Sequence, residues 1–281
     1  MQWRIEATHA AVLRDLVPPL VGLAEQAGRV ILAVYARGDG LVAAKGDSSP
    51  VTTADHAADA ILQDGLRFLT PDWPVVSEER AASHLPDFDR PVWLVDPLDG
   101  TREFLDRNGE FAVSIGLIVA GHPVLGVVHG PAVGLSAWGI VGPGRDRGAW
   151  RRDGSGPIRS IACRPRPAAG AVAAVSRRHG RDAALDAFLA AESVGETRAC
   201  GSALKFCLVA SGEADLYPRF GTTCEWDTAG GHAIVAAAGG DVTLVDGRAL
   251  TYGKPGLRNP DFIARGLSTG QADGETRAGS G

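Results

Sequence analysis

The sequence lacks the cysteine and glycine patterns that mark many common functional sites. Its four cysteines form no C-x-x-C pair and have no companion histidines at zinc-finger spacing, so we expect reduced, packed thiols rather than a structural zinc site. No G-x-x-x-x-G-K-[ST] motif occurs, which removes the basic parts of P-loop nucleotide hydrolysis. The glycine-rich GPGRDRG lacks the strand-turn-helix context of a dinucleotide-binding loop.

A surplus of positive charge and long hydrophobic runs are missing as well. The formal net charge is -5 and the sequence pI is about 5.8, which argues against nucleic acid as a partner. No uninterrupted run approaches the ~20 apolar residues of a membrane-spanning helix, so we expect no integral membrane segment. The first 20 residues carry acidic residues and prolines where a signal peptide needs an apolar stretch, which favours a cytoplasmic location.

What is present is an ordinary globular composition, 45% hydrophobic and 22% charged, with room for a sizeable core. Apolar residues recur at helical spacing directly after Pro18 and Pro19, which predicts a helix that begins there and runs over 20–36. A second helix is predicted from near Asp55. Strands are expected at 74–77 and 92–95, each followed by acidic residues, and as a meander over 111–140.

The second half alternates between strand-like and helix-like segments, as an α/β unit should. The Gly- and Arg-rich stretch 142–157 predicts a loop or hairpin, and the change of composition there places a boundary near residue 162. We therefore expect one half at 1–162, a second at 163–266, and a frayed, Gly-rich tail at 267–281.

Two aspartates in the segment VDPLDGT are candidates for binding hard divalent cations, which prefer carboxylate and carbonyl oxygens. Asp96 ends an apolar strand and Asp99 follows three residues later, while the intervening proline stiffens the chain so that the Leu98 carbonyl can turn toward the same point. The backbone N–H groups of Gly100 and Thr101 could receive a phosphate oxygen. The alternative is that Asp-Pro and Asp-Gly are ordinary turn dipeptides.

Further carboxylates at the ends of predicted elements favour the metal-binding interpretation. Glu78 follows the strand at 74–77, and Asp227 stands at the start of a predicted helix, where the helix dipole tolerates its charge. Taken alone, Asp227 could be a plain N-cap. Together with Asp96 and Asp99, however, these placements predict a two-metal centre, in which one carboxylate bridges the ions.

The segments KGDSSPVTTAD, VVSEE, WLVDPLDGTREF and EWDTAGGHAI resemble the inositol monophosphatase superfamily over about residues 20–265. This resemblance implies a layered α-β-α-β-α sandwich and a Mg²⁺-dependent phosphatase with two ions and room for a third. NGEFAVSIGLI, SRRHG and GSALKFCLVASGEADLYPRFG are more similar to the CysQ-type 3'(2'),5'-bisphosphate nucleotidases, which implies hydrolysis of 3'-phosphoadenosine 5'-phosphate to AMP and phosphate. The alternatives are an inositol monophosphatase or sugar (bis)phosphatase of the same fold, and a non-catalytic binder of nucleotide or metal.

The resemblance also assigns roles to the acidic residues. It gives one Mg²⁺ to Glu78, Asp96 and the Leu98 carbonyl, and a second to Asp96, Asp99 and Asp227. It places Asp55 beside Thr101 as the pair that activates a water for in-line attack, with Glu78 as a further catalytic group. For Asp55 the alternative is a helix cap, and for Thr101 a turn hydroxyl.

Substrate selection is assigned by the same likeness to the second half, where cationic and hydroxyl groups would meet a second phosphate. His179, Ser202, Lys205 and Arg219 are the candidates, joined by Glu78, Leu98, Asp99, Gly100, Thr101 and Asp227 at the reacting phosphate. Alternatively, Lys205 is a solvated helix position, His179 a surface histidine and Arg219 a surface ion-pair partner. Arg178, Cys224 and Glu225 depart from the family pattern, and Glu225 is expected to add negative charge beside Asp227.

The expected partner is a small soluble phosphate monoester. The sequence leaves both monomer and homodimer open, and the family likeness leaves peripheral attachment at the inner membrane face open. Lys45, near the expected metal loops, remains unassigned.

Overall fold

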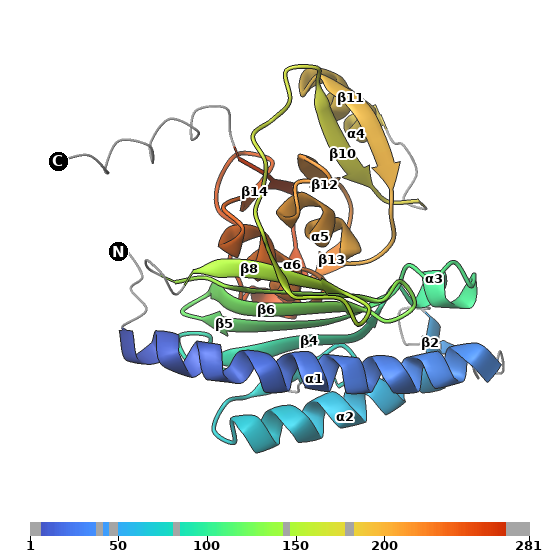
Figure 1. The fold of residues 1–281 in the computed structure, drawn as a ribbon, viewed down its shortest axis with the longest axis vertical. Helices are drawn as coiled ribbons and strands as arrows, with labels where there is room; N and C mark the ends of the chain where they lie inside the picture. The colour runs from blue at the N-terminus through green and yellow to red at the C-terminus, as the bar shows by residue number, and fades with distance from the viewer. Residues whose placement is uncertain are drawn as a thin grey trace.

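The computed structural model describes residues 7–37, 42–44, 50–80, 85–142, 147–177 and 183–267. Two sheets and three layers of helix alternate through the molecule (Figure 1). Helices α1 and α2 cover one face of the larger sheet, and α5 and α6 lie between the two sheets. Helix α4 closes the outer face of the smaller sheet. This order confirms the predicted α-β-α-β-α sandwich.

The larger sheet has seven strands in sequential order, β3 to β9. Strands β3 and β4 pair in parallel, and every later pair is antiparallel, as a meander requires. The strands are β3 (Val75–Ser77), β4 (Val92–Asp99), β5 (Ala112–Val119), β6 (His122–Gly130), β7 (Leu135–Ile140), β8 (Gly148–Asp153) and β9 (Arg159–Ile161). The predicted meander is confirmed, and the stretch predicted as a loop or hairpin supplies β8, in which Ala149 is buried against the core.

Helix α1 (Ala7–Arg37) begins well before the predicted start and contains Pro18 and Pro19 inside it. Each proline removes one backbone hydrogen bond. The apolar stripe nevertheless continues in front of them, since Leu13 and Leu16 are buried in the same cluster as the residues that follow. Burial of that stripe therefore outweighs the local helix-breaking signal.

Helix α1 is also, among the described residues, the one stretch that could cross a membrane by length and composition, over Ala11–Arg37. The expectation of no integral membrane segment stays a prediction. The same properties fit a core helix, and α1 packs against α2 (Thr53–Leu69) and the sheet.

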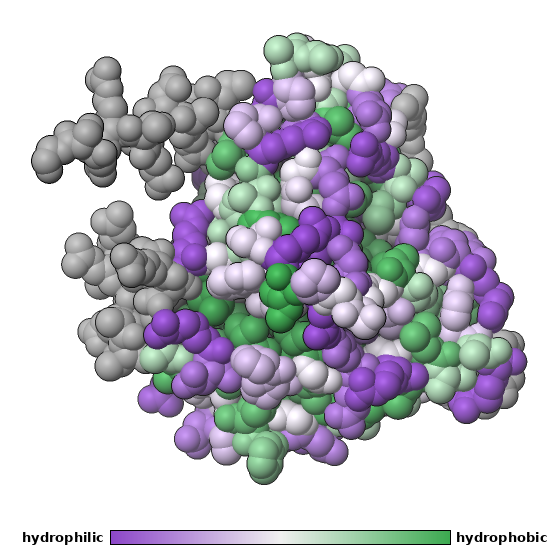
Figure 2. All heavy atoms as spheres, viewed as in Figure 1, coloured by the Kyte–Doolittle hydropathy of each residue, from purple (hydrophilic) through white to green (hydrophobic). Residues whose placement is uncertain are grey.

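On the face shown in Figure 2, hydrophobic residues occur in small groups between hydrophilic ones.

The smaller sheet has the strand order β11-β10-β12-β16-β14. Its strands are β10 (Ala171–Val175), β11 (Val194–Ala199), β12 (Leu216–Arg219), β14 (Asp241–Leu244) and β16 (Phe262–Arg265). The helices associated with it are α4 (Ala183–Ala191), α5 (Leu204–Ala210) and α6 (Glu225–Ala237). The predicted boundary near residue 162 falls between the last strand of the larger sheet and the first of the smaller one, and separate halves stay a prediction. All but the first residue of the expected tail lies outside the described residues.

The remaining elements are short. They are β1 (Val42–Ala44) paired with β2 (Pro50–Thr52), β13 (Thr223–Cys224) paired with β15 (Arg258–Asn259), the helix α3 (Thr101–Leu105) and the 3-10 turn at Pro255–Leu257.

A row of three glycines brings α6 into direct contact with the larger sheet. Gly116, Gly126 and Gly139 are register partners on β5, β6 and β7. A Cβ at Gly126 would lie 2.1 Å from the backbone oxygen of Gly230 on α6, and one at Gly116 would lie 2.4 Å from the Cβ of Ala229. Only glycine permits this approach. The row therefore fixes where the N-terminus of α6, which carries Asp227, lies against the sheet.

Candidate active site

Strand β4 presents Asp96 and Asp99 to one pocket through an irregularity in its pairing with β5. Residues three apart in a regular strand point to opposite faces of the sheet. Here the register shifts between Asp96, which faces Ser114, and Asp99, which faces Ala112. This bulge lets both carboxylates and Leu98 line the same pocket. The Leu98 N–H donates to Asp96 Oδ1 at 3.0 Å, which holds that carboxylate in place.

Two more carboxylates reach the pocket from other elements. Glu78 follows β3, and its N–H donates to the Val95 carbonyl of β4 at 3.1 Å. Asp227 is the third residue of α6, where its Oδ2 accepts the Cys224 N–H at 2.8 Å in a capping box. Oxygen atoms of Glu78, Asp96 and Asp227 lie within 4.8 Å of one another. The structure therefore brings together the four carboxylates that the sequence singled out.

The crowding of these carboxylates has an electrostatic cost, which appears in their pKa values. Burial, and then the charges of Glu78 and Asp99, raise the pKa of Asp96 well above its usual range. Burial and then the charge of Asp99 raise the pKa of Asp227 to about 8. Burial raises the pKa of Asp99 to about 6, although nearby Lys205 opposes this shift. A cluster of hard oxygen donors that repel one another fits divalent cations such as Mg²⁺.

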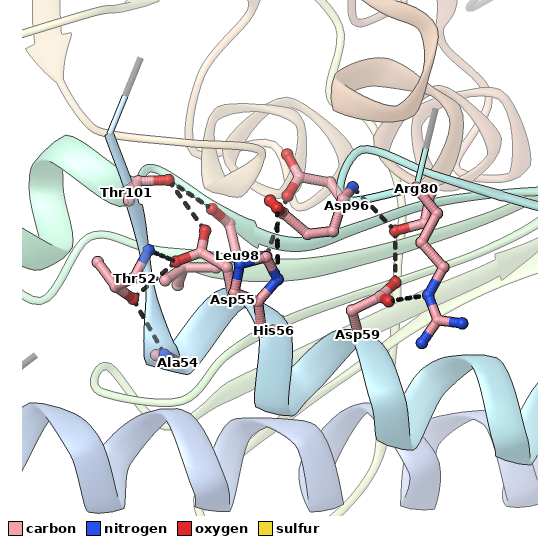
Figure 3. Close-up of polar contacts among 11 residues, drawn as sticks. Thr52, Ala54, Asp55, His56, Asp59, Arg80, Asp96, Leu98 and Thr101 are labelled. Carbon is pink, nitrogen blue, oxygen red and sulfur yellow. Dashed lines mark hydrogen bonds and ion pairs between the residues drawn. The ribbon is translucent and has the colours of Figure 1, made fainter. Parts of the chain in front are cut away.

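Asp55 and Thr101 meet beside this cluster, on the side of α2 (Figure 3). The Thr101 hydroxyl lies 3.3 Å from both Asp55 Oδ1 and the Leu98 carbonyl. The other carboxylate oxygen of Asp55 accepts the N–H and the hydroxyl of Thr52 at 2.7 and 2.6 Å. Asp55 is thus both the capping residue that the alternative described and a partner of Thr101. It is 1% exposed.

Three of the four residues assigned to substrate selection line the pocket, namely Ser202, Lys205 and Arg219. Lys205 is 4% exposed, so the alternative of a solvated helix position is wrong. Its ammonium donates to the Ser202 carbonyl at 2.7 Å and lies 5.1 Å from the ring centroid of Tyr217. Burial lowers the pKa of Lys205, and the charge of Asp99 opposes that effect.

The fourth substrate candidate, His179, lies outside the described residues, as do Arg178 and Lys45.

Glu225 does not add its charge beside Asp227, as was expected from the sequence. It is fully buried and turned toward Lys254, whose ammonium lies 2.6 Å from Glu225 Oε1. The added negative charge is therefore balanced by Lys254 rather than left beside Asp227.

The pocket also contains residues that sequence reasoning did not single out. The N–H of Ala203 donates to Asp99, which connects the start of α5 to β4. Gly100, with φ of 93°, turns the chain from β4 into α3, and Arg102 and Glu103 follow it into the pocket wall. The further lining residues are Ser176, Tyr217, Thr223, Thr228 and Phe262. Two signals in the sequence could have indicated some of these residues. Arg102 and Glu103 directly follow the Asp-Gly-Thr segment, and Ser176 stands at the end of a strand-like segment.

Comparison with known proteins places this arrangement among phosphatases. The model of the inositol monophosphatase family matches residues 13–272. The chain is 45% identical over 246 residues to the 3'(2'),5'-bisphosphate nucleotidase CysQ of Escherichia coli K12, covering 85% of this chain and 95% of that protein. Among solved structures, CysQ from Bacteroides thetaiotaomicron aligns with a TM-score of 0.72 at 33% identity over 92% of this chain and 97% of that one. The suppressor protein SuhB from Bartonella henselae aligns with a TM-score of 0.72 at 28% identity, over 90% and 94%.

Proposed function

The chain belongs to the inositol monophosphatase family, whose members are metal-dependent phosphatases, and we propose that it is a Mg²⁺-dependent 3'(2'),5'-bisphosphate nucleotidase. Its substrate would be 3'-phosphoadenosine 5'-phosphate, and its products AMP and inorganic phosphate. The observation that carries this proposal is the composition of the pocket. The pocket lining combines the carboxylates of Glu78, Asp96, Asp99 and Asp227 with the buried ammonium of Lys205 and the guanidinium of Arg219.

The residues that would hold Mg²⁺ are the carboxylates that line the pocket and the Leu98 carbonyl. We assign Glu78, Asp96 and the Leu98 carbonyl to one ion, and Asp96, Asp99 and Asp227 to a second. When bound, the ions supply positive charge to the phosphoryl oxygens and lower the pKa of a coordinated water. The raised pKa values of Asp96 and Asp227 support this assignment, because bound cations would offset both the burial and the mutual repulsion that raise them.

Asp55 and Thr101 would manage the proton of the attacking water. If Thr101 donates its hydroxyl hydrogen to Asp55 Oδ1, the lone pairs of the Thr101 oxygen turn toward the pocket, where they can accept from water. The two donors on Asp55 Oδ2 come from Thr52 and fix the plane of the carboxylate. The pair therefore orients the nucleophile opposite the leaving oxygen, as in-line displacement requires.

Lys205 and Arg219 would bind the phosphate that is not hydrolysed. A bisphosphate carries a second dianionic group, and desolvated cations bind such groups through charge-assisted hydrogen bonds. Lys205 is held by the Cys200 and Ser202 carbonyls rather than by a carboxylate, although Asp99 lies close enough to affect its pKa. A phosphate could therefore join its coordination without breaking a salt bridge.

Phosphate release from a panel of substrates tests this proposal. We expect 3'-phosphoadenosine 5'-phosphate to be hydrolysed with a higher kcat/KM than inositol 1-phosphate or fructose 1,6-bisphosphate, and hydrolysis to stop when EDTA removes Mg²⁺. Lys205→Met should lower kcat/KM about tenfold for the adenosine bisphosphate and less for inositol 1-phosphate, because one charge-assisted contact is lost. Preference for inositol 1-phosphate would instead favour an inositol monophosphatase.

We also propose a cytoplasmic setting for this activity. All four cysteines, Cys163, Cys200, Cys207 and Cys224, are free in the structure, and Cys163 and Cys207 are buried. Free thiols persist in a reducing compartment. Thiol titration of the unfolded protein, without reductant, should find four reactive groups.

A further inference from the structure

Glu78 lies in a tight turn formed by Ser77, Glu78, Glu79 and Arg80, which follows β3. The Arg80 N–H donates to the Ser77 carbonyl at 3.2 Å and closes the turn. The Glu79 N–H also donates to the Ser77 hydroxyl, at 3.3 Å. A turn that projects a metal ligand into a pocket needs its ends held, since otherwise the ligand would sample many positions.

Both ends of this turn are held by one carboxylate on α2, that of Asp59, whose contact with Arg80 is drawn in Figure 3. Asp59 Oδ1 accepts the Ser77 hydroxyl at 2.6 Å, and Asp59 Oδ2 accepts the Arg80 Nε–H at 2.6 Å. Asp59 is 3% exposed and Ser77 is 1% exposed, so the first of these hydrogen bonds is shielded from water. The Arg80 side chain is half exposed, and its ion pair is accordingly screened.

Asp59 lies one helical turn after Asp55, on the same buried face of α2. Asp55 contacts Thr101, which follows β4, whereas Asp59 contacts the turn that follows β3. One rigid helix thus connects the segment of the Asp55–Thr101 pair with the segment that carries Glu78. The separation of these two segments is therefore set by four residues of helix rather than by flexible loops.

We propose that Asp59 is a positioning residue that fixes the Glu78 carboxylate for metal binding through Ser77 and the turn. The inference rests on the proposed function, because it takes Glu78 as a ligand of Mg²⁺. Asp59 itself does not line the pocket. Partners of this kind, placed behind a ligand, typically change metal affinity about 10- to 100-fold when removed.

Binding of Mn²⁺ without substrate, followed by the loss of the free-ion electron paramagnetic resonance signal, tests the proposal directly. Asp59→Asn and Ser77→Ala should each raise the Kd for Mn²⁺ about tenfold. Asp64→Asn is the matched control, because it removes the same charge from an exposed position of the same helix and should leave the Kd unchanged. The double variant should bind only slightly more weakly than the weaker single variant, since the hydrogen bond that joins the two side chains is lost in both.

Ser77→Ala keeps the test decisive if Asp59→Asn fails to fold, since it removes one hydroxyl only. Wild-type Mn²⁺ affinity in Ser77→Ala would overturn the proposal. Glu78→Gln separates this outcome from failure of the proposed function. If Glu78→Gln weakens Mn²⁺ binding while Ser77→Ala does not, only the positioning role fails. If Glu78→Gln leaves the affinity unchanged, the metal assignment itself fails.

Discussion

Helices α2 and α6 begin in the same way but contribute different chemistry. Each has an aspartate as its third residue, Asp55 and Asp227, and each aspartate gives one oxygen to a capping box. The second oxygen of Asp55 faces the Thr101 hydroxyl. Asp227 instead faces the carboxylates of Glu78 and Asp96. Under the proposed function, the same local motif would serve proton handling at one helix and metal binding at the other, and only the neighbours differ.

The two helix starts are also held in place differently. The first half of α2 is connected to the site by hydrogen bonds that Asp55 accepts from Thr101 and Asp59 accepts from Ser77. The start of α6 is fixed by the close approach that Gly116 and Gly126 allow. Glu225 at this helix start also accepts the N–H groups of Gly253 and Lys254 at 2.8 and 2.9 Å, so packing and hydrogen bonds together fix the helix that carries Asp227.

Of the substitutions at the two helix starts, Asp227→Asn should have the largest effect on activity. The amide can still accept the Cys224 N–H, so the helix start survives, but a charged metal ligand is lost. We expect kcat/KM to fall about 1,000-fold or more, since the loss corresponds to several kcal/mol of charge stabilisation. Affinity for Mn²⁺ should fall in parallel. Phosphate release and Mn²⁺ titration measure the two effects, and unchanged turnover would contradict the metal assignment.

Asp55→Asn should lower turnover without lowering metal affinity, whereas Asp227→Asn should lower both. Removing an oriented base typically costs about 100- to 10,000-fold in rate. The cap should persist, because the amide oxygen can still accept from Thr52. Thr101→Val is the matched variant and should give a similar loss, with little further loss in the double variant. A parallel fall in Mn²⁺ affinity would show that Asp55 belongs with the metal ligands instead.

Much of this comparison was predictable from the sequence, because caps and strand ends have local signals. The helix start near Asp55 and the strand near 74–77 with Glu78 after it are confirmed, whereas the strand predicted at 92–95 runs on to Asp99 and so contains Asp96. The motifs around them also identified the family, as the match over residues 13–272 confirms. The individual site roles, by contrast, came from the resemblance and stay predictions.

What the sequence could not provide depends on contacts between distant segments. The bulge that brings Asp96 and Asp99 to one side exists only in the pairing of β4 with β5. The early start of α1 depends on burial that outweighs two prolines. Asp59 has no signal of its own, because an aspartate inside an amphipathic helix is usually solvated, and its two partners are 18 and 21 residues away.

The smallest expected effect is on the stability of the metal-free protein. The pKa of Asp227 in the folded state, about 8, lies above its usual value of 3.8, so the folded protein binds the extra proton between these limits. Stability therefore falls as pH rises toward 8. Two buried histidines, His129 and His232, have lowered pKa values of about 4 and about 3, and their opposite contribution is complete once pH exceeds about 6.5. Between pH 6.5 and 8.5, the pH dependence of stability therefore reports on the carboxylates rather than on these histidines.

In EDTA, the Tm of the wild-type protein should fall by about 3 °C across this interval, and Mg²⁺ should restore it. Asp227→Asn should reduce the dependence, because its amide does not titrate while Asp96 keeps its own contribution, whereas Asp55→Asn should retain the wild-type slope. Differential scanning calorimetry at matched ionic strength measures all three proteins. Equal slopes in the two variants would mean that the two aspartates share one electrostatic environment, which would remove the distinction between the two helix starts.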